Sequence, residues 1–228
     1  MKISNPFSKL TRFEWFLWIF SVIVVVVSFF LSETDPLTFV ASLVGVTALI
    51  FLAKGMVSGQ VLVIIFAVLY AVISFKERYY GEMITYALMT APMAILAMIA
   101  WIKNPYGKGE EVRVSTLNAK KLVLTLLLTA LVTVVFYFIL GALGTANLTV
   151  STLSIATSFF AAALTYLRSP YYAIGYVLND VVLIALWVSS ALSDSSYIPV
   201  VACFVMFLFN DLYGFFNWRK MKKRQQKS

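Results

Sequence analysis

Residues 122–141 read LVLTLLLTALVTVVFYFILG, a run of twenty residues without one charged side chain. An α-helix needs about 20 apolar residues to cross the hydrocarbon core of a bilayer, which is roughly 30 Å thick. Lys120 and Lys121 bound the run on its N-terminal side. This stretch therefore predicts a helix that spans a membrane.

The rest of the chain has the same character. Of its 228 residues, 61% are apolar and 12% are charged, and the mean hydropathy is +0.91. An average soluble domain is about 45–50% apolar and about 25% charged, so an ordinary soluble protein is excluded. No independent soluble domain fits between the apolar runs. We predict an all-α integral membrane protein with eight transmembrane helices, over residues 13–32, 37–53, 60–75, 83–102, 122–141, 149–167, 171–191 and 197–217.

The residue types exclude several kinds of chemistry. The sequence has no histidine and only one cysteine, Cys203. Acid–base catalysis by histidine, an intrachain disulfide and a metal site of His or Cys ligands are therefore excluded. We expect no catalytic residue, no metal, no cofactor and no enzyme activity.

Basic residues fall almost entirely on one side of the predicted topology. With eight spans and an inside N-terminus, 16 of the 18 Lys and Arg residues lie in inside segments, and only Lys76 and Arg78 lie outside. Cytoplasmic loops of membrane proteins carry such an excess of basic residues. The net charge of +8 therefore indicates orientation and not a nucleic-acid partner. We expect a multi-pass protein of the inner (cytoplasmic) membrane with both termini in the cytoplasm and a basic tail at the lipid surface.

Two parts of the chain resemble each other at an offset of 117 residues. Tyr70 aligns with Trp187 and Trp101 with Trp218, and the apolar runs of the first part fall on those of the second. One linker helix between the parts gives both the same direction through the membrane. We predict a 3+1+3 parallel repeat after an extra N-terminal helix, a plan that places a transporter's substrate site between the repeats. The segments are 1–36 (N-terminal helix), 37–103 (first repeat), 104–147 (loop and linker helix), 148–218 (second repeat) and 219–228 (tail).

Polar residues inside the predicted spans are costly and are therefore candidates for a functional site. The run 171–191 places its Asn-Asp pair and its aromatic residues on one helical face, and the run 197–217 carries a second Asn-Asp pair. No Lys or Arg lies in the middle of any span, so the two aspartates have no basic partner there. Unpaired carboxylates and aromatic faces suit a small, flat solute that is positively charged or forms hydrogen bonds. The candidate binding residues are Gln60, Tyr70, Glu82, Tyr176, Asn179, Asp180, Trp187, Asn210 and Asp211.

A structural role is the alternative reading of these polar and aromatic residues. Asn and Asp side chains in membranes can hydrogen-bond neighbouring helices, for about 0.6 kcal/mol on average. Pro92, inside the run 83–102, predicts a kink. Four tryptophans lie at span ends, where aromatic residues anchor proteins at the membrane interface; they are Trp15, Trp18, Trp101 and Trp218.

Motifs in both halves resemble those of one transporter family. The stretch YVLNDVVLIALW (176–187), followed by FNDLYGFFNW (209–218), is similar to PnuC-type nicotinamide riboside transporters. The stretch YYGE (79–82) is similar to the first half of that family. The resemblance extends over about residues 37–220.

One motif departs from the family. The pattern W-x-x-W-x-x-x-N, frequent in its seventh run, is represented here by Tyr172, Gly175 and Asn179, so the asparagine is kept and both tryptophans are replaced.

The resemblance implies a SWEET-like fold of seven core helices, a homotrimer, and uptake of nicotinamide riboside by facilitated diffusion. Phosphorylation by a cytoplasmic riboside kinase would then trap the vitamin. The family takes no energy from ATP, and this sequence contains no G-x-x-x-x-G-K-[ST] phosphate loop.

The chemistry of nicotinamide riboside fits the candidate residues, since it combines a cationic pyridinium ring with ribose hydroxyls. We expect the two asparagines to hydrogen-bond the solute and one aspartate to offset the ring charge. Tyr70, Tyr176 and Trp187 are expected to stack on the ring, and Gln60 and Glu82 to lie at the site or at a gate.

Three alternatives remain open. A transporter of the same fold could carry another vitamin or a nucleoside, such as thiamine. A proton-coupled symporter could use Asp180 or Asp211 as the proton carrier. An integral-membrane enzyme or a structural subunit is disfavoured by polar pairs at mid-span and by the lack of a nucleophile–base set.

Overall fold

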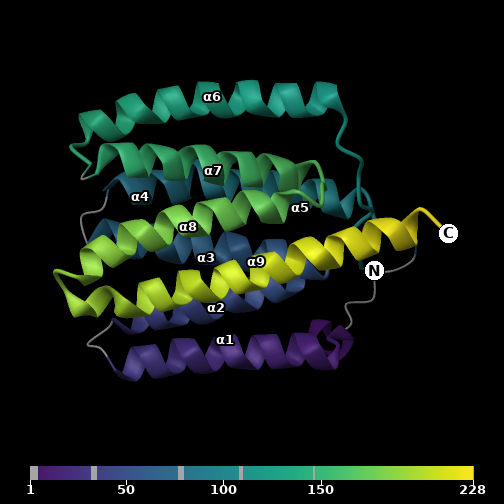
Figure 1. Cartoon of the computed structure of the whole chain (residues 1–228), viewed down its shortest axis with the longest axis horizontal. Helices are drawn as coiled ribbons and strands as arrows, with labels where there is room; N and C mark the ends of the chain where they lie inside the picture. Colours follow the sequence, from purple (N-terminus) through teal and green to yellow (C-terminus); the bar gives the residue numbers. More distant parts are fainter. Residues whose placement is uncertain (1–4, 32–34, 77–79, 108–109, 146, 228) are drawn as a thin grey trace.

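Membrane-length helices form the bulk of the protein. The computed structural model describes residues 5–31, 35–76, 80–107, 110–145 and 147–227. Eight helical stretches in it are long and apolar enough to cross a membrane, which confirms the predicted all-α membrane fold. They lie side by side, and both termini lie at one end of the bundle, here named the terminal face (Figure 1). The helices are α1 (Arg12–Phe30), α2 (Pro36–Ala53), α3 (Val57–Lys76), α4 (Tyr80–Ile84), α5 (Ala91–Ile102), α6 (Ala119–Ala142), α7 (Leu148–Tyr166), α8 (Tyr172–Ala191) and α9 (Ile198–Gln225).

Helix starts follow capping signals in the sequence. Thr11 and Glu14 form a capping box at the start of α1, in which each side chain accepts a hydrogen bond from the other residue's backbone N–H. Asp35 caps α2 ahead of Pro36, and Asn118 caps α6 by accepting from the backbone N–H of Lys121. These side chains satisfy N–H groups that have no partner within the helix.

The fourth span is interrupted. Where one run was predicted over 83–102, α4 and α5 are joined by a π-helical segment, Thr85–Thr90. Pro92 follows directly; its ring lacks an N–H and crowds the carbonyl four residues earlier. The kink expected at Pro92 therefore takes the form of a widened turn on its N-terminal side, a feature that is frequent at functional sites.

Helix α9 is longer than predicted. The run was expected to end at residue 217, but the helix continues to Gln225. The residues beyond Trp218 are good helix formers without Gly or Pro, and Lys222, Lys223 and Arg224 in the last turn complement the helix dipole. At 1.5 Å per residue its 28 residues extend about 42 Å, roughly 12 Å more than the hydrocarbon core.

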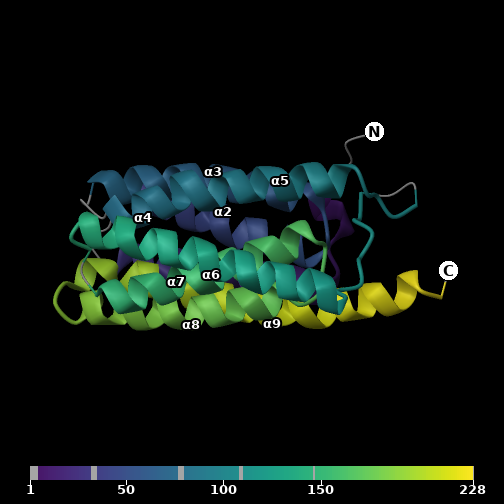
Figure 2. The same cartoon turned by 90° about the horizontal axis from the view of Figure 1, so that it is seen from above.

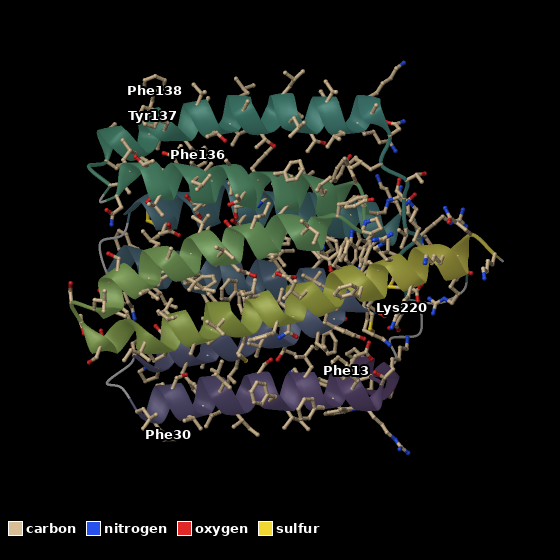
Figure 3. The ribbon with its side chains drawn as sticks, in the orientation of Figure 1. Phe13, Phe30, Phe136, Tyr137, Phe138 and Lys220 are labelled. Atoms are coloured by element: carbon tan, nitrogen blue, oxygen red, sulfur yellow. The ribbon has the colours of Figure 1, made fainter. Side chains whose placement is uncertain are left out.

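Apolar side chains cover the sides of the bundle. Phe30 on α1 and Phe138 on α6 point outward and are 79% and 67% exposed (Figure 3). Of α6, only Thr125 and Leu140 are buried. Nitrogen-bearing side chains gather instead at the terminal face, where Lys220 lies (Figure 3). This distribution fits apolar sides in lipid and a charged end in water.

The six central helices form two triplets that run in the same direction. The first triplet is α2, α3 and α4–α5, and the second is α7, α8 and α9 (Figure 1). Seen from above, α3 and α5 lie on one side and α8 and α9 on the other (Figure 2). The linker α6 packs on α7, and α1 packs on α2 and α9.

Two tryptophans join the triplets reciprocally at the terminal face. Trp101 of α5 donates its indole N–H to the carbonyl of Thr165 in α7 at 3.0 Å, and Trp218 of α9 donates to the carbonyl of Leu52 in α2 at 2.8 Å. Leu52 and Thr165 are each the last residue but one of their helix. The last helix of each triplet is thus bonded to the first helix of the other, as a parallel repeat predicts.

The ends of α2 and α7 are also built alike. Each is followed by a residue with left-handed backbone, Gly55 (φ 67°) and Arg168 (φ 56°), whose N–H bonds back to the carbonyl of Leu52 or Thr165. The second lone pair of that carbonyl receives the indole. The expectation that Trp101 and Trp218 are interface anchors is wrong, because they are only 1% and 0% exposed.

Trp101→Phe and Trp218→Phe should each destabilise the protein by about 1 kcal/mol, because each removes one buried hydrogen bond and keeps an aromatic ring. Thermal unfolding in detergent should show midpoints about 2–4 °C lower. Trp15→Phe is the control, since this ring is 36% exposed. An equal loss in the control variant would contradict the reciprocal-bond account.

Candidate functional site

A cavity lies between the two triplets. Residues from α2, α3, the π-helical segment, α5, α7, α8 and α9 line it, and its open space measures about 70 Å³, room for a few water molecules. Gly45 lets Phe207 close one wall, because a Cβ there would lie 2.5 Å from the ring. The space exists because small residues occur on several helices, among them Gly45, Ala48, Ala94, Ala97 and Ala162.

Five of the nine predicted site residues line this cavity. They come from α3, α8 and α9, which the fold brings together from distant parts of the sequence; they are Gln60, Tyr176, Asn179, Asp180 and Asp211. The other four, Tyr70, Glu82, Trp187 and Asn210, do not line it.

Asp180 and Asp211 place two carboxyl groups at the cavity. Each is 3% exposed, and the two side chains interact with one another. Within the described ranges, neither forms an ion pair with Lys or Arg. The same part of the chain holds no group of three or more His, Cys, Asp or Glu residues able to bind a metal ion. A buried carboxylate needs a counter-charge, so this pair suits a cationic solute.

Asn179 is held by hydroxyl groups of α7. Its amide oxygen lies 2.9 Å from Oγ1 of Thr157 and 3.4 Å from Oγ of Ser154, and both hydroxyls can donate to it. These contacts occupy the oxygen and leave the amide nitrogen available to a bound solute. Asn179 lies near the middle of α8, beside Asp180.

Two further polar groups at the cavity lack partners among the described residues. They are Nε2 of Gln60 and Oγ1 of Thr90. A buried polar group without a hydrogen bond costs about 1–3 kcal/mol, which a solute that bonds to it would recover. Both are therefore suited to contact a polar ligand.

Thr90 is a site residue that the sequence analysis missed. Threonine hydroxyls in helices usually bond to the carbonyl four residues earlier, as those of Thr125 and Thr129 do here. For Thr90 that carbonyl belongs to Tyr86, and the π-helical turn gives it to the N–H of Ala91 instead. The signal in the sequence was Pro92, two residues further along, which predicted a kink here.

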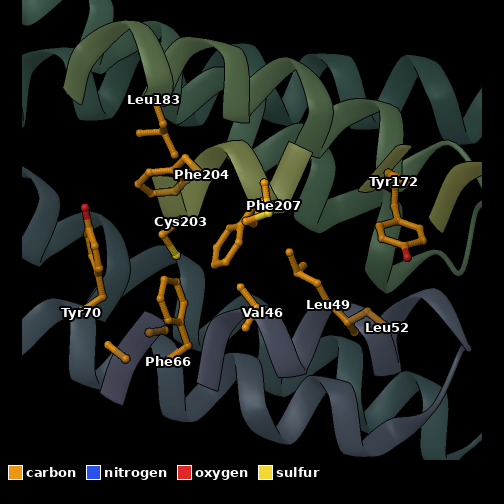
Figure 4. Packing of buried hydrophobic residues seen from close by; sticks show 14 of the residues in the cluster. Val46, Leu49, Leu52, Phe66, Tyr70, Tyr172, Leu183, Cys203, Phe204 and Phe207 are labelled. Carbon is orange, nitrogen blue, oxygen red and sulfur yellow. The ribbon is translucent and has the colours of Figure 1, made fainter. Parts of the chain in front are cut away.

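An aromatic cluster closes the cavity toward the face opposite the termini. The ring of Tyr70 lies 4.4 Å from that of Tyr86, 6.4 Å from Phe204 and 6.5 Å from Trp187, measured between centroids. Figure 4 shows Tyr70, Phe66 and Phe204 gathered on this side. Two predicted stacking residues, Tyr70 and Trp187, thus lie beyond the cavity wall.

Glu82 lies in the same region, on α4. It is partly buried and interacts electrostatically with Tyr70 and Tyr86. This places its carboxyl group near the aromatic cluster; Glu82 does not itself line the cavity, but Tyr86 does.

A second aromatic cluster closes the cavity toward the terminal face. Tyr172 packs 4.9 Å from Trp218, which packs 5.3 Å from Trp101. In Figure 4, Leu49 and Leu52 separate Tyr172 from the aromatic side chains at the other end. The cavity is therefore enclosed between two aromatic layers.

Asn210 faces away from the cavity. Its amide nitrogen donates to Oγ of Ser21 on α1 at 3.0 Å and to the carbonyl of Met206 at 2.8 Å. Successive residues of a helix point about 100° apart, so Asp211 can face the cavity while Asn210 joins α9 to α1.

Known proteins resemble this chain in sequence and in fold. The family model described as nicotinamide mononucleotide transporter matches residues 35–220. The nicotinamide riboside transporter PnuC of Neisseria mucosa is 29% identical over 96% of this chain and 85% of its own length. The PnuC of Haemophilus influenzae is 24% identical over 82% of this chain and 81% of its own length.

A solved structure has a similar fold. The crystal structure of the vitamin B3 transporter PnuC superposes with a TM-score of 0.83 at 26% identity, over 95% of this chain and 94% of that chain. The resemblance to PnuC-type transporters is thereby confirmed, and the chain is a transporter and not an enzyme. With 35–220 matched by the family model, the chain belongs to the nicotinamide mononucleotide transporter family.

Proposed function

We propose that this protein carries nicotinamide riboside across the membrane. The observation that supports this most is the Asp180–Asp211 pair, which faces an enclosed cavity and has no basic partner among the described residues. The riboside has a cationic pyridinium ring, and the relatives named above are nicotinamide riboside transporters.

Each cavity residue has a role in this proposal. Asp180 and Asp211 offset the ring charge, Tyr176 packs against the ring, and the amide nitrogens of Asn179 and Gln60 donate to oxygen atoms of the solute. The outer aromatic residues, with Tyr70 and Trp187 among them, act as a gate and not as walls of the site.

Transport in this proposal is facilitated diffusion. The cavity opens alternately past its two aromatic layers, and phosphorylation by a cytoplasmic kinase traps the riboside. The protein lies in the inner membrane with its termini in the cytoplasm, as the basic residues favour. A SWEET-like parallel repeat, supported by the reciprocal bonds of Trp101 and Trp218, and a homotrimer complete the proposal.

Asn179→Ala should weaken riboside binding by about 1–3 kcal/mol, or roughly 5- to 150-fold, because it removes the donor aimed at the solute. Asn210→Ala is the matched control on the neighbouring helix: it should lower the thermal midpoint and leave the affinity within about twofold, since this amide bonds to Ser21. Calorimetric titration of both variants gives the comparison. Unchanged riboside affinity in Asn179→Ala would contradict the assignment of the binding site.

In proteoliposomes, uptake of radiolabelled riboside should stop when the inside and outside concentrations are equal, and an imposed pH gradient should not raise that level. The alternative to exclude is a proton-coupled symporter, in which the buried pair Asp180–Asp211 would carry the proton. Accumulation above equilibrium that is driven by the pH gradient and lost in Asp211→Asn would establish the symporter.

An excess of unlabelled thiamine should leave the uptake of radiolabelled riboside unchanged. Competition by thiamine equal to that by unlabelled riboside would contradict the riboside as substrate.

A further inference from the structure

A second, polar cavity lies on the terminal face, outside the bundle core. It measures about 540 Å³ and shares no lining residue with the enclosed cavity. We name it the basic notch. Its walls are the loop between α5 and α6 and the last turns of α9; the lining residues are Tyr106, Gly107, Arg113, Val114, Thr116, Lys222, Gln225 and Gln226.

The walls of the basic notch are fixed to each other by Gln225. Its side-chain oxygen accepts from the backbone N–H of Val114 at 2.7 Å. Its side-chain nitrogen lies 3.1 Å from the carbonyl of Val112 and 2.7 Å from Oε1 of Glu111. The backbone N–H of Arg113 is held by the carbonyl of Asn104 at 2.9 Å. The loop is therefore positioned against α9 by specific hydrogen bonds.

Positive charge at the notch is not balanced by acidic partners. Arg113 and Lys222 lie on its two walls. Glu110 and Glu111, the acidic residues of this loop that the structure describes, form ion pairs with Lys9 and Arg224 instead. Neither Arg113 nor Lys222 has an ion pair to a carboxylate within the described ranges.

A third basic residue adds to this charge. Arg168 lies beside the loop, where its carbonyl accepts from the backbone N–H of Ser115 at 2.9 Å. The pKa of its guanidinium is lowered by partial burial and by the positive charge of Arg113. Like charges are thus held together at one wall, an arrangement that an anion would stabilise.

The depth of the notch matches the headgroup layer of a bilayer. About 20 residues of α9, from Ile198 to Trp218, suffice to cross the hydrocarbon core. Lys222 and Gln225 then lie roughly 6 and 10 Å further along the axis. The polar headgroup layer on each side of a bilayer is roughly 5–8 Å thick.

We propose that the basic notch binds the phosphate group of an anionic lipid headgroup. The guanidinium of Arg113 can donate two parallel hydrogen bonds to phosphate oxygens, Lys222 supplies a point charge from the opposite wall, and the hydroxyl of Thr116 supplies a further donor. Bound there, the phosphate joins the loop between α5 and α6 to α9. Inorganic phosphate offers the same chemistry without the acyl chains, so the test separates the two sources.

The test is a calorimetric titration of the full-length protein in non-ionic detergent with short-chain phosphatidylglycerol. Parallel titrations use phosphatidylcholine of the same chain length and inorganic phosphate. The variant Arg113→Gln/Lys222→Gln should bind phosphatidylglycerol about 25-fold more weakly, at roughly fivefold per basic residue. The control Lys120→Gln/Lys223→Gln removes the same charge at exposed positions outside the notch and should change the affinity by less than about threefold.

Tight binding of phosphatidylglycerol, weaker binding of the other two ligands and a loss confined to the notch variant would support a headgroup site. If inorganic phosphate binds with equal affinity and this binding is lost in the same variant, the notch is a site for phosphate from solution and not for a lipid headgroup. Equal losses in both double variants would overturn the proposal, because they would show only diffuse attraction by surface charge.

Discussion

The hydrocarbon core of a bilayer offers no water to polar groups, so a protein there must satisfy them internally, and this constraint explains most of the structure. The hydroxyls of α6 bond to their own helix, and the tryptophans at the terminal face bond to helix-end carbonyls. Among the described residues, several buried polar atoms still lack a hydrogen bond. Three of them belong to residues that line the cavity between the triplets, namely Gln60, Thr90 and Asp180, while others, such as those of Ser58 and Asn210, lie elsewhere. Polar groups that gather without partners around one space are what a solute site requires.

The two closures of this cavity differ in construction. Toward the terminal face, Trp101 and Trp218 bond reciprocally across the triplets, so opening that side must break two hydrogen bonds and separate two rings. Toward the opposite face, aromatic rings around Tyr70 close the space, with a side-chain hydrogen bond between Tyr70 and Trp187, beside the π-helical segment Thr85–Thr90. In the proposed transport cycle, the reciprocal bonds of Trp101 and Trp218 must break for release at the terminal face.

Hydropathy predicted all eight spans because lipid exposure dictates composition along a whole helix, and α6 is the clearest instance. The polar residues of the site were found for the same reason, since a charge in a span is conspicuous. Their directions were not predictable. Asn210 and Asp211 are neighbours in sequence, and only the packing of α1 on α9 shows that one contacts Ser21 while the other faces the cavity. Thr90 and the burial of Trp101 depend likewise on a π-turn and on contacts between distant helices.

The central claim is that a buried acidic pair selects a cationic solute. Nicotinamide riboside and its reduced dihydro form have nearly the same shape, but only the former carries a charge on the ring. Calorimetric affinities of both ligands for the unmodified protein and for Asp180→Asn/Asp211→Asn therefore test the claim directly. The account predicts that the unmodified protein prefers the cation by roughly tenfold or more and that the double variant loses this preference. Equal affinities of the unmodified protein for the two forms would contradict it.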